Sequence, residues 1–386
     1  MSRMISVLLM IFILLTVCLP ALAQGEDTKS VAETLDFSEI EKYVNKVDEE
    51  VKEHLPDLSI EKLYQDAKEG RISWNPKDVF LGLVRFFFRE ILANSALLTR
   101  LIILAVAGAV LTNLQGTFDK GNISLLAHGV VYLVLITIAL SSFSVAINTG
   151  KEAIENMSGF LYAVMPVLLT LLAAMGGVTS AALIQPVMVV ILTLAITIIK
   201  TVIFPMIYFM VILNVVSHIS PEFKVNRLAG LFKDLAIGLL GIVMTIFVGF
   251  LSLQGITGAV ADGLTFKAAK FAAGVFIPVV GKSLADAMDT VIGTSLILKN
   301  GIGILGVIVI FIMCALPAVK IIAMSLMYRI VAAIIQPFGN SQLADALHGL
   351  ANSLILVFAV VAAAGLMFFF VLSITVCSAN ISMMFR

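Results

Sequence analysis

Long apolar stretches, separated by short polar loops, fill the chain from about residue 99 to its end. Most of them reach or exceed the roughly 20 residues that an α-helix needs to cross the hydrocarbon core of a bilayer. The pattern therefore predicts an all-α, polytopic membrane domain over residues 99–386. The stretches are 100–114, 124–147, 159–177, 179–217, 229–256, 271–297, 302–335 and 342–378.

Two of these stretches are far too long for a single straight crossing, and residues 179–217 are the clearest example. Residues 179–217 would extend about 58 Å as one helix, at about 1.5 Å per residue. The segment therefore either folds back near Lys200 or tilts and protrudes from the membrane. The sequence leaves both readings, and with them the number of crossings, open.

Residues 1–23 predict a secretory signal peptide. Arg3 precedes an apolar run at residues 5–19, and Ala-Leu-Ala at 21–23 has the small residues of a cleavage site. The alternative is an uncleaved anchor helix, because the run is close to spanning length. Either way, the residues that follow begin outside the cytoplasm.

Residues 24–78 show charged positions between regularly spaced apolar ones. The apolar positions recur every three or four residues, as on one face of an amphipathic helix. We predict an extracytoplasmic helical segment that is either a solvated spacer or a docking surface for a partner helix, and the apolar stripe favours docking. The stripe consists of Phe37, Ile40, Val44, Val47, Val51 and Leu55.

Residues 79–98 place Arg85, Arg89 and Glu90 among aromatic and aliphatic residues. This is the pattern of an amphipathic helix that lies in the headgroup region of a membrane. The alternative is that the segment extends the first spanning helix, with both arginines reaching outward.

Composition supports the same class. Apolar types make up 60% of the 386 residues, well above the roughly 45–50% of soluble domains. Of the 25 acidic residues, 15 lie between Glu26 and Asp78, so the formal net charge of zero describes no single region. Cys18, Cys314 and Cys377 all lie in apolar runs, and no pair suggests a disulfide framework or a zinc site. Membrane lipid is an expected partner and nucleic acid is not.

Proline spacing indicates an internal duplication. Pro166 and Pro205 are 39 residues apart, and Pro278 and Pro317 repeat this spacing 112 residues later. FLYAVMP, which ends at Pro166, resembles FAAGVFIP, which ends at Pro278. We predict units of about 110 residues at 118–227 and 228–342, with a final partial unit at 343–386.

A second comparison supports the duplication. Segments that begin at residues 123, 228 and 343 align without gaps, superpose His128, Lys233 and His348, and each open a long apolar helix. Repeated units with Pro- and Gly-interrupted apolar segments are typical of transporter-like folds, whose helices break near the midplane. The interrupted segments here are 160–183 and 271–297.

Charged residues in the second interrupted segment are the candidate site. Lys282, Asp286 and Asp289 have spacings of four and three, which place them on one helical face. Charges in a spanning segment by default mark a pathway, whereas the same segment also fits an amphipathic helix at the interface. With Pro166 and Pro278 at the interruptions, these are the candidate pathway or interface residues.

No motif of an enzyme is present. The chain has no G-x-S-x-G, H-E-x-x-H, Walker A or Cys-His constellation. GIGILG, from Gly301, opens an apolar helix and lacks the preceding strand of a nucleotide-binding turn. We therefore expect no catalytic residue, cofactor or metal, and no enzyme activity.

Two runs resemble the stage III sporulation protein AE family of endospore-forming bacteria: MPVLLTLLAAMGGVTSAALIQPV from Met165 and LPAVKIIAMSLMYRIVAAIIQPFGNSQLADALHGL from Leu316. The order of leader, charged outer segment and polytopic region agrees as well. The resemblance implies a multi-pass component of the channel or secretion-like assembly that joins mother cell and engulfed forespore. It would lie in the mother-cell-derived outer forespore membrane, with residues 24–78 between the two membranes. Its partners would be other stage III sporulation proteins, and forespore development after engulfment would require it.

Two other functions remain as alternatives. An independent secondary transporter of a small solute would carry its coupling on Lys282, Asp286 or Asp289, and an intramembrane enzyme would use Asp286 and Asp289 as a catalytic pair. A channel scaffold tolerates Asp286→Asn, whereas a coupled transporter or an enzyme does not.

Overall fold

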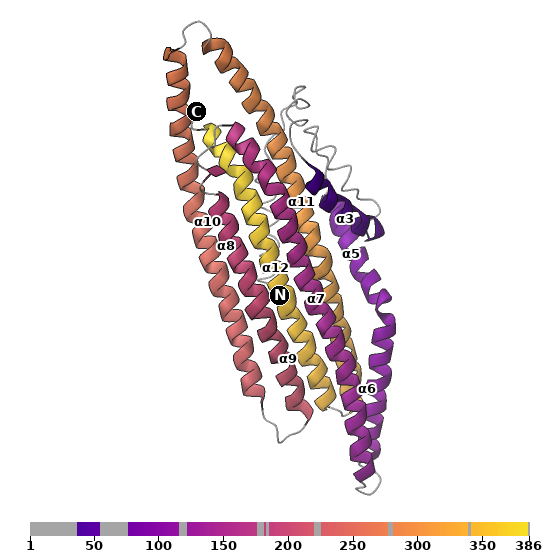
Figure 1. The fold of residues 1–386 in the computed structure, drawn as a ribbon. Coiled ribbons are helices and arrows are strands. Elements are labelled where there is room, and N and C mark those ends of the chain that lie inside the picture. Colours follow the sequence, from indigo (N-terminus) through magenta and orange to yellow (C-terminus); the bar gives the residue numbers. More distant parts are fainter. Residues whose placement is uncertain are drawn as a thin grey trace.

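The computed structural model describes residues 37–54, 76–115, 122–175, 181–182, 185–219, 225–276, 281–338 and 341–384. Within these ranges every regular element is a helix, and the long helices run side by side as an elongated bundle (Figure 1). The elements are α3 (Ser38–His54), α5 (Pro76–Ala93), α6 (Ser95–Gln115), α7 (Asn122–Ala174), α8 (Gln185–Ile198), the π-helix η2 (Ile199–Ile203), α9 (Phe204–Ile219), α10 (Asn226–Phe276), α11 (Gly281–Ile335), the 3-10 helix η3 (Gln336–Phe338) and α12 (Ser341–Met384).

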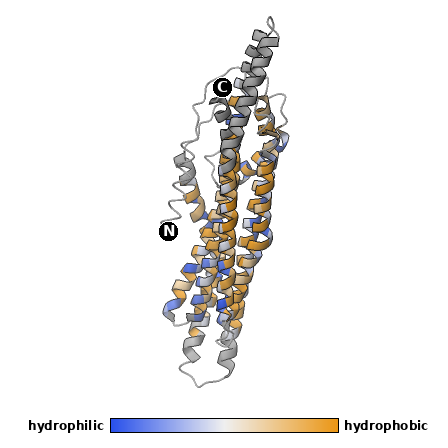
Figure 2. Cartoon of the chain, turned by 90° about the vertical axis from the view of Figure 1, so that its left-hand side faces the viewer, coloured by the Kyte–Doolittle hydropathy of each residue, from blue (hydrophilic) through white to orange (hydrophobic). Residues whose placement is uncertain are grey.

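The prediction of an all-α, polytopic membrane protein is confirmed. In the described part of the chain, five helical segments are long and apolar enough to cross a membrane, or six if the bent pair α5 and α6 makes one crossing. Apolar residues dominate these helices over most of their length (Figure 2). The five segments are Gly129–Ala174, Pro186–His218, Asn226–Ser252, Ser295–Ile335 and Gln342–Val376.

Helix α12 lies at the centre of the bundle, where it packs against α7, α9, α10 and α11. Its closest neighbour is α11, and small residues allow the two backbones to approach. A Cβ atom at Gly306 would lie 3.2 Å from Leu372 Cδ1, and one at Gly365 would lie 3.0 Å from Cys314 Cβ. The absence of side chains at these glycines therefore sets the spacing of the two helices.

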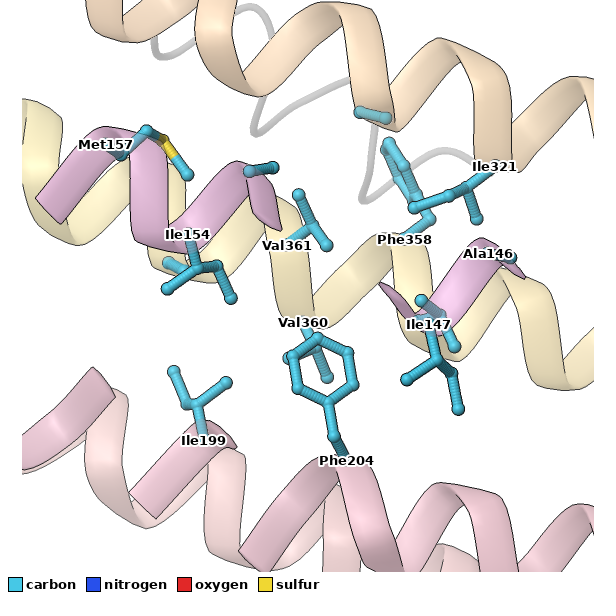
Figure 3. Packing of buried hydrophobic residues seen from close by; sticks show 14 of the residues in the cluster. Ala146, Ile147, Ile154, Met157, Ile199, Phe204, Ile321, Phe358, Val360 and Val361 are labelled. Carbon is cyan, nitrogen blue, oxygen red and sulfur yellow. The ribbon is translucent and has the colours of Figure 1, made fainter. Parts of the chain in front are cut away.

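The other side of α12 is filled by bulky apolar residues. Phe204 points from α9 toward Val360 of α12, with Ile154 of α7 nearby (Figure 3). All three side chains are fully buried. A Cβ atom at Gly150 would lie 2.9 Å from Val361 Cγ2 and 3.3 Å from Phe204 Cζ. The ring of Phe204 thus occupies space that a side chain at position 150 would need.

The long segment around Lys200 does not fold back. Helices α8 and α9 are joined by η2, whose last turn is closed by the Phe204 N–H donating to the Ile199 carbonyl, five residues earlier. Pro205 follows directly and has no N–H, so an ordinary α-helical bond from this position is impossible. A π turn accommodates such a local defect without ending the helix. Of the two readings of residues 179–217, the fold-back is therefore wrong.

The interruption predicted within residues 160–183 does not lie at Pro166. Helix α7 continues through Pro166 to Ala174, so residues 160–174 are the end of one 53-residue helix. The proline ring lies on an exposed face, and Thr170 Oγ1 donates to the Pro166 carbonyl at 2.9 Å. Losing one backbone donor at such a position does not stop the helix when the neighbouring turns keep their bonds. Residues 176–180 and 183–184 lie outside the described residues.

The structure does not confirm the internal duplication. Pro166 lies inside α7, whereas its proposed equivalent Pro278 falls between the end of α10 and the start of α11, outside the described residues. The three aligned segments nevertheless all open long helices, which begin at Asn122, Asn226 and Ser341. Shared helix starts are therefore present, and the match between the two proline pairs is not confirmed.

The predicted interfacial helix at 79–98 is divided in two. Helix α5 ends at Ala93 and α6 begins at Ser95, with a bend of 48° between them. Asn94 lies at the bend, and its Nδ2 donates to the Glu90 carbonyl at 2.9 Å. The position of α5 in the headgroup region stays a prediction.

Candidate functional site: a charged cavity between α3, α5, α7 and α11

The structure does not assemble the predicted site residues among its described side chains. Lys282, Asp286 and Asp289 belong to the first turns of α11, but their side chains lie outside the described residues, as does Pro278. Pro166 lies on the surface of α7. The pathway role of these residues therefore stays a prediction, and the described polar groups gather elsewhere.

Helix α3 packs on the membrane bundle of its own chain. Its apolar stripe faces α7 and α11, and the stripe residues Phe37, Ile40, Val44 and Val47 are all buried. The Tyr43 ring meets the Phe160 ring edge to face, with centroids 6.2 Å apart. The opposite face of α3 is exposed and polar, and it carries Glu39, Lys42, Asn45 and Glu49.

A cavity of about 430 Å³ lies where α3 meets α5, α7 and α11. Each of the four helices contributes one ionisable side chain to its wall: Lys46, Glu90, Glu152 and Lys320. The remaining wall is largely apolar and includes Phe86, Met313 and Leu316. The cavity is thus amphipathic, and its four charges sum to zero.

Two of the charged groups in the wall are held by direct contacts. Lys46 Nζ donates to Asn156 Oδ1 at 2.9 Å, which ties α3 to α7. The Glu90 side chain is only 11% exposed; its Oε1 accepts from Asn94 Nδ2 at 2.7 Å and lies 3.9 Å from Lys320 Nζ. At this distance the ion pair of Glu90 and Lys320 is loose, and Asn94 holds the carboxylate more firmly.

Glu152 differs from the other three. Its side chain is exposed, and among the residues that the structure describes it forms no hydrogen bond or ion pair. Its carboxylate therefore keeps its full capacity to accept hydrogen bonds. It is the most available acidic group in the cavity wall.

Pro317 lies in the same wall and removes one backbone donor from α11. It lies inside α11 and has no N–H, so it cannot donate to the Met313 carbonyl one turn earlier. Both residues line the cavity. The wall offers the Glu152 carboxylate beside two ammonium donors, which suits a ligand that carries both charges.

Sequence reasoning missed this cavity. From the sequence, Lys320 is expected to reach outward from an apolar run. Lys46 is expected to be one of several charges on the polar face of a helix. Glu90 gave the clearest signal, because it shares a helical stripe with Phe86, which α5 buries against α11. A carboxylate on a buried stripe needs polar partners.

A further ion pair fixes the surface beside η2. Lys200 Nζ lies 2.5 Å from Glu155 Oε1, so the π turn of α8–α9 is joined to α7. The side chains are 31% and 58% exposed. A residue that read as a lone charge in an apolar run thus has a partner on the next helix.

One lysine is enclosed by the bundle. Lys299 of α11 is fully buried, and its Nζ donates to the Val376 carbonyl of α12 at 2.7 Å. Ser295 and Asn300, within four residues of it in sequence, are also buried.

Among the described residues, no group of three or more His, Cys, Asp or Glu side chains is arranged to hold a metal ion.

Long apolar helices around a central α12, with an amphipathic helix docked at their side, define a polytopic, all-helical membrane protein. The family model for stage III sporulation protein AE matches residues 58–379. The chain belongs to this family, which connects it to sporulation. The stage III sporulation protein AE of Bacillus subtilis (strain 168) is 40% identical over 317 residues, which cover 82% of this chain and 79% of the relative. No solved structure matches the chain.

The family membership confirms the resemblance seen in the sequence. The relative is named for a stage of sporulation and not for a catalytic activity.

Proposed function

We propose that this protein is a multi-pass component of a channel or secretion-like complex that links the mother cell and the forespore. It acts with other stage III sporulation proteins, as a passage or as the scaffold for one, and carries out no catalysis. Its place is the mother-cell-derived outer forespore membrane, and forespore development after engulfment depends on it. The observation that carries this proposal is the family match over residues 58–379.

Helix α3 supports the proposal. The described residues of its apolar stripe are buried against α7 and α11, while its outward face is polar. Each charged side chain on that face would cost about 2.5–3.5 kcal/mol at the centre of a membrane. We therefore assign α3 to the aqueous space between the two forespore membranes, where its outward face is available to partner proteins.

The test is complementation in Bacillus subtilis that lacks its own relative. We expect this chain to restore heat-resistant spores, a fluorescent fusion to surround the engulfed forespore, and other stage III sporulation proteins to co-purify with it in mild detergent. A matched pair of variants separates the two faces of α3: Lys42→Glu with Glu49→Lys on the outward face, and Lys46→Gln in the cavity.

The decisive readout is co-purification. Partner proteins lost from the outward-face variant, but kept by the cavity variant, support the assignment of α3. A chain that reaches the membrane in normal amounts but restores no spores and retains no partner would refute the proposal.

A further inference from the structure

The charges of the cavity wall form a complementary set. Lys46 and Lys320 supply two ammonium groups, each with three N–H donors of which the observed contacts use only part. Glu152 supplies a carboxylate with no partner among the described residues. The cavity can therefore receive an anion and a cation at the same time.

Size and surroundings restrict the ligand further. The volume of about 430 Å³ is many times the 10–15 Å³ or so that one water molecule needs. This is larger than one small ion needs. The apolar part of the wall, from Phe86, Met313 and Leu316, can cover carbon atoms attached to the charged group. A bare ion would leave that part of the wall in contact with water.

Helix α5 places the cavity next to an apolar outer surface. The stripe of α5 that includes Phe86 and Glu90 faces α11, whereas a second stripe of large apolar residues faces outward. Such a stripe on an amphipathic helix is the surface that acyl chains cover. The exposed residues are Leu81 at 52%, Val84 at 39%, Phe88 at 60% and Leu92 at 71%.

We propose that the cavity binds a phosphoethanolamine group. Its phosphate oxygens accept hydrogen bonds from Lys46 and Lys320, and its primary ammonium donates to the Glu152 carboxylate. The group has two sources, the headgroup of phosphatidylethanolamine or a free phosphoethanolamine. The outward stripe of α5 points to the lipid. This inference does not depend on the role in sporulation.

The wall discriminates against other headgroups. An anionic headgroup without an ammonium would put its phosphate near Glu152 with nothing to neutralise that carboxylate, and like charges at close range disfavour each other. A choline headgroup has no N–H and cannot donate to Glu152. We therefore expect the cavity to bind phosphatidylethanolamine more tightly than phosphatidylcholine or phosphatidylglycerol.

The experiment measures lipid binding to the full-length chain in detergent by native mass spectrometry, with each lipid added in turn. We expect phosphatidylethanolamine to bind about tenfold more tightly than phosphatidylglycerol or phosphatidylcholine, the ratio that one charge-assisted hydrogen bond typically gives. Glu152→Gln should abolish this preference. Lys320→Gln should weaken the binding of all three lipids. The control is Glu49→Gln, because Glu49 lies on the exposed outward face of α3 and does not line the cavity; it should keep the preference.

A second arm distinguishes the sources. Calorimetric titration of free phosphoethanolamine into lipid-depleted protein should show Glu152-dependent binding if the ligand is a solute, and none if the lipid anchor is required. Equal binding of the three lipids together with no binding of the free compound would overturn the proposal. An undiminished preference in Glu152→Gln would do the same.

Discussion

The phenol ring of Tyr43 lies directly over Gly159. A Cβ atom at position 159 would stand 2.8 Å from Tyr43 Cζ and closer still to the phenol oxygen. One residue further along α7, the Phe160 ring packs edge to face with the same tyrosine ring, and Lys46 binds Asn156 one turn back. The docking of α3 therefore depends on the presence of glycine, with no side chain, at position 159 of α7.

We predict that Gly159→Val releases α3 from the bundle. The added methyl groups cannot share space with Tyr43, and overpacking of this kind costs about 1–3 kcal/mol. In a background without native cysteines, Lys46→Cys and Asn156→Cys should be joined efficiently by a short bismaleimide, and Gly159→Val should reduce the yield. Gly129→Val is the control, since a Cβ there meets nothing within 4 Å. Equal yields in both variants would contradict the prediction.

The contact between Gly365 and Cys314 predicts a coupled pair of mutations. Gly365→Ala places a methyl group against the Cys314 side chain, 3.0 Å from its Cβ. The variant should lower the free energy of unfolding by about 1–3 kcal/mol. Adding Cys314→Ala removes the obstructing sulfur. The double variant should therefore lose less unfolding free energy than the two single variants lose together. Thermal unfolding in detergent measures this.

A matched glycine serves as the control for that cycle. Gly238→Ala adds a methyl group that meets nothing within 4 Å, and alanine favours a helix over glycine by up to about 1 kcal/mol. We expect this variant to be as stable as the wild type or more so. Strict additivity of Gly365→Ala and Cys314→Ala would refute the close approach of α11 and α12.

The ion pair of Lys200 and Glu155 should matter more in lipid than in detergent. Both residues lie within candidate spans. An exposed pair in water contributes about 0.2–1 kcal/mol, whereas an unpaired charge inside a spanning segment costs more, up to about 2.5–3.5 kcal/mol at the membrane centre. In nanodiscs, Lys200→Gln and Glu155→Gln should each reduce the folded fraction, and the double variant should recover it. If the two losses simply add, the pair faces water.

Asp286→Asn separates the scaffold from the coupled transporter. A scaffold needs no protonatable group at this position, so spore yield should stay within about twofold of wild type, a change of under about 0.5 kcal/mol in effective activity. The control is Asp345→Asn on the exposed start of α12. A large loss of spores in Asp286→Asn alone, with normal amounts of protein in the membrane, would favour a transporter or an enzyme.

Local pattern was enough to predict the helices and not enough to predict their breaks. The helix starts at Asn122, Asn226 and Ser341 follow polar loops, and hydropathy alone reveals them. Pro166 is a break in the sequence pattern but not in α7, because its ring lies on the surface and costs only one backbone bond. Whether a proline stops a helix depends on its neighbours in space, which hydropathy does not contain.

The stripe on α3 shows the same division. Its periodicity predicts an amphipathic helix and favours docking. The surface that it docks on is α7 and α11 of the same chain, and Gly159 makes room for Tyr43 there.

By itself, the sequence determined that this protein is an all-helical membrane protein of one family, because hydropathy and helical periodicity are properties of neighbouring residues. Only the tertiary structure decided which charges meet. Lys46, Glu90, Glu152 and Lys320 come from four helices that are far apart along the chain, and they share one cavity because α3 and α5 pack against α7 and α11. Contacts over such separations depend on how side chains fill space between helices, and apolar patterns leave many packings open.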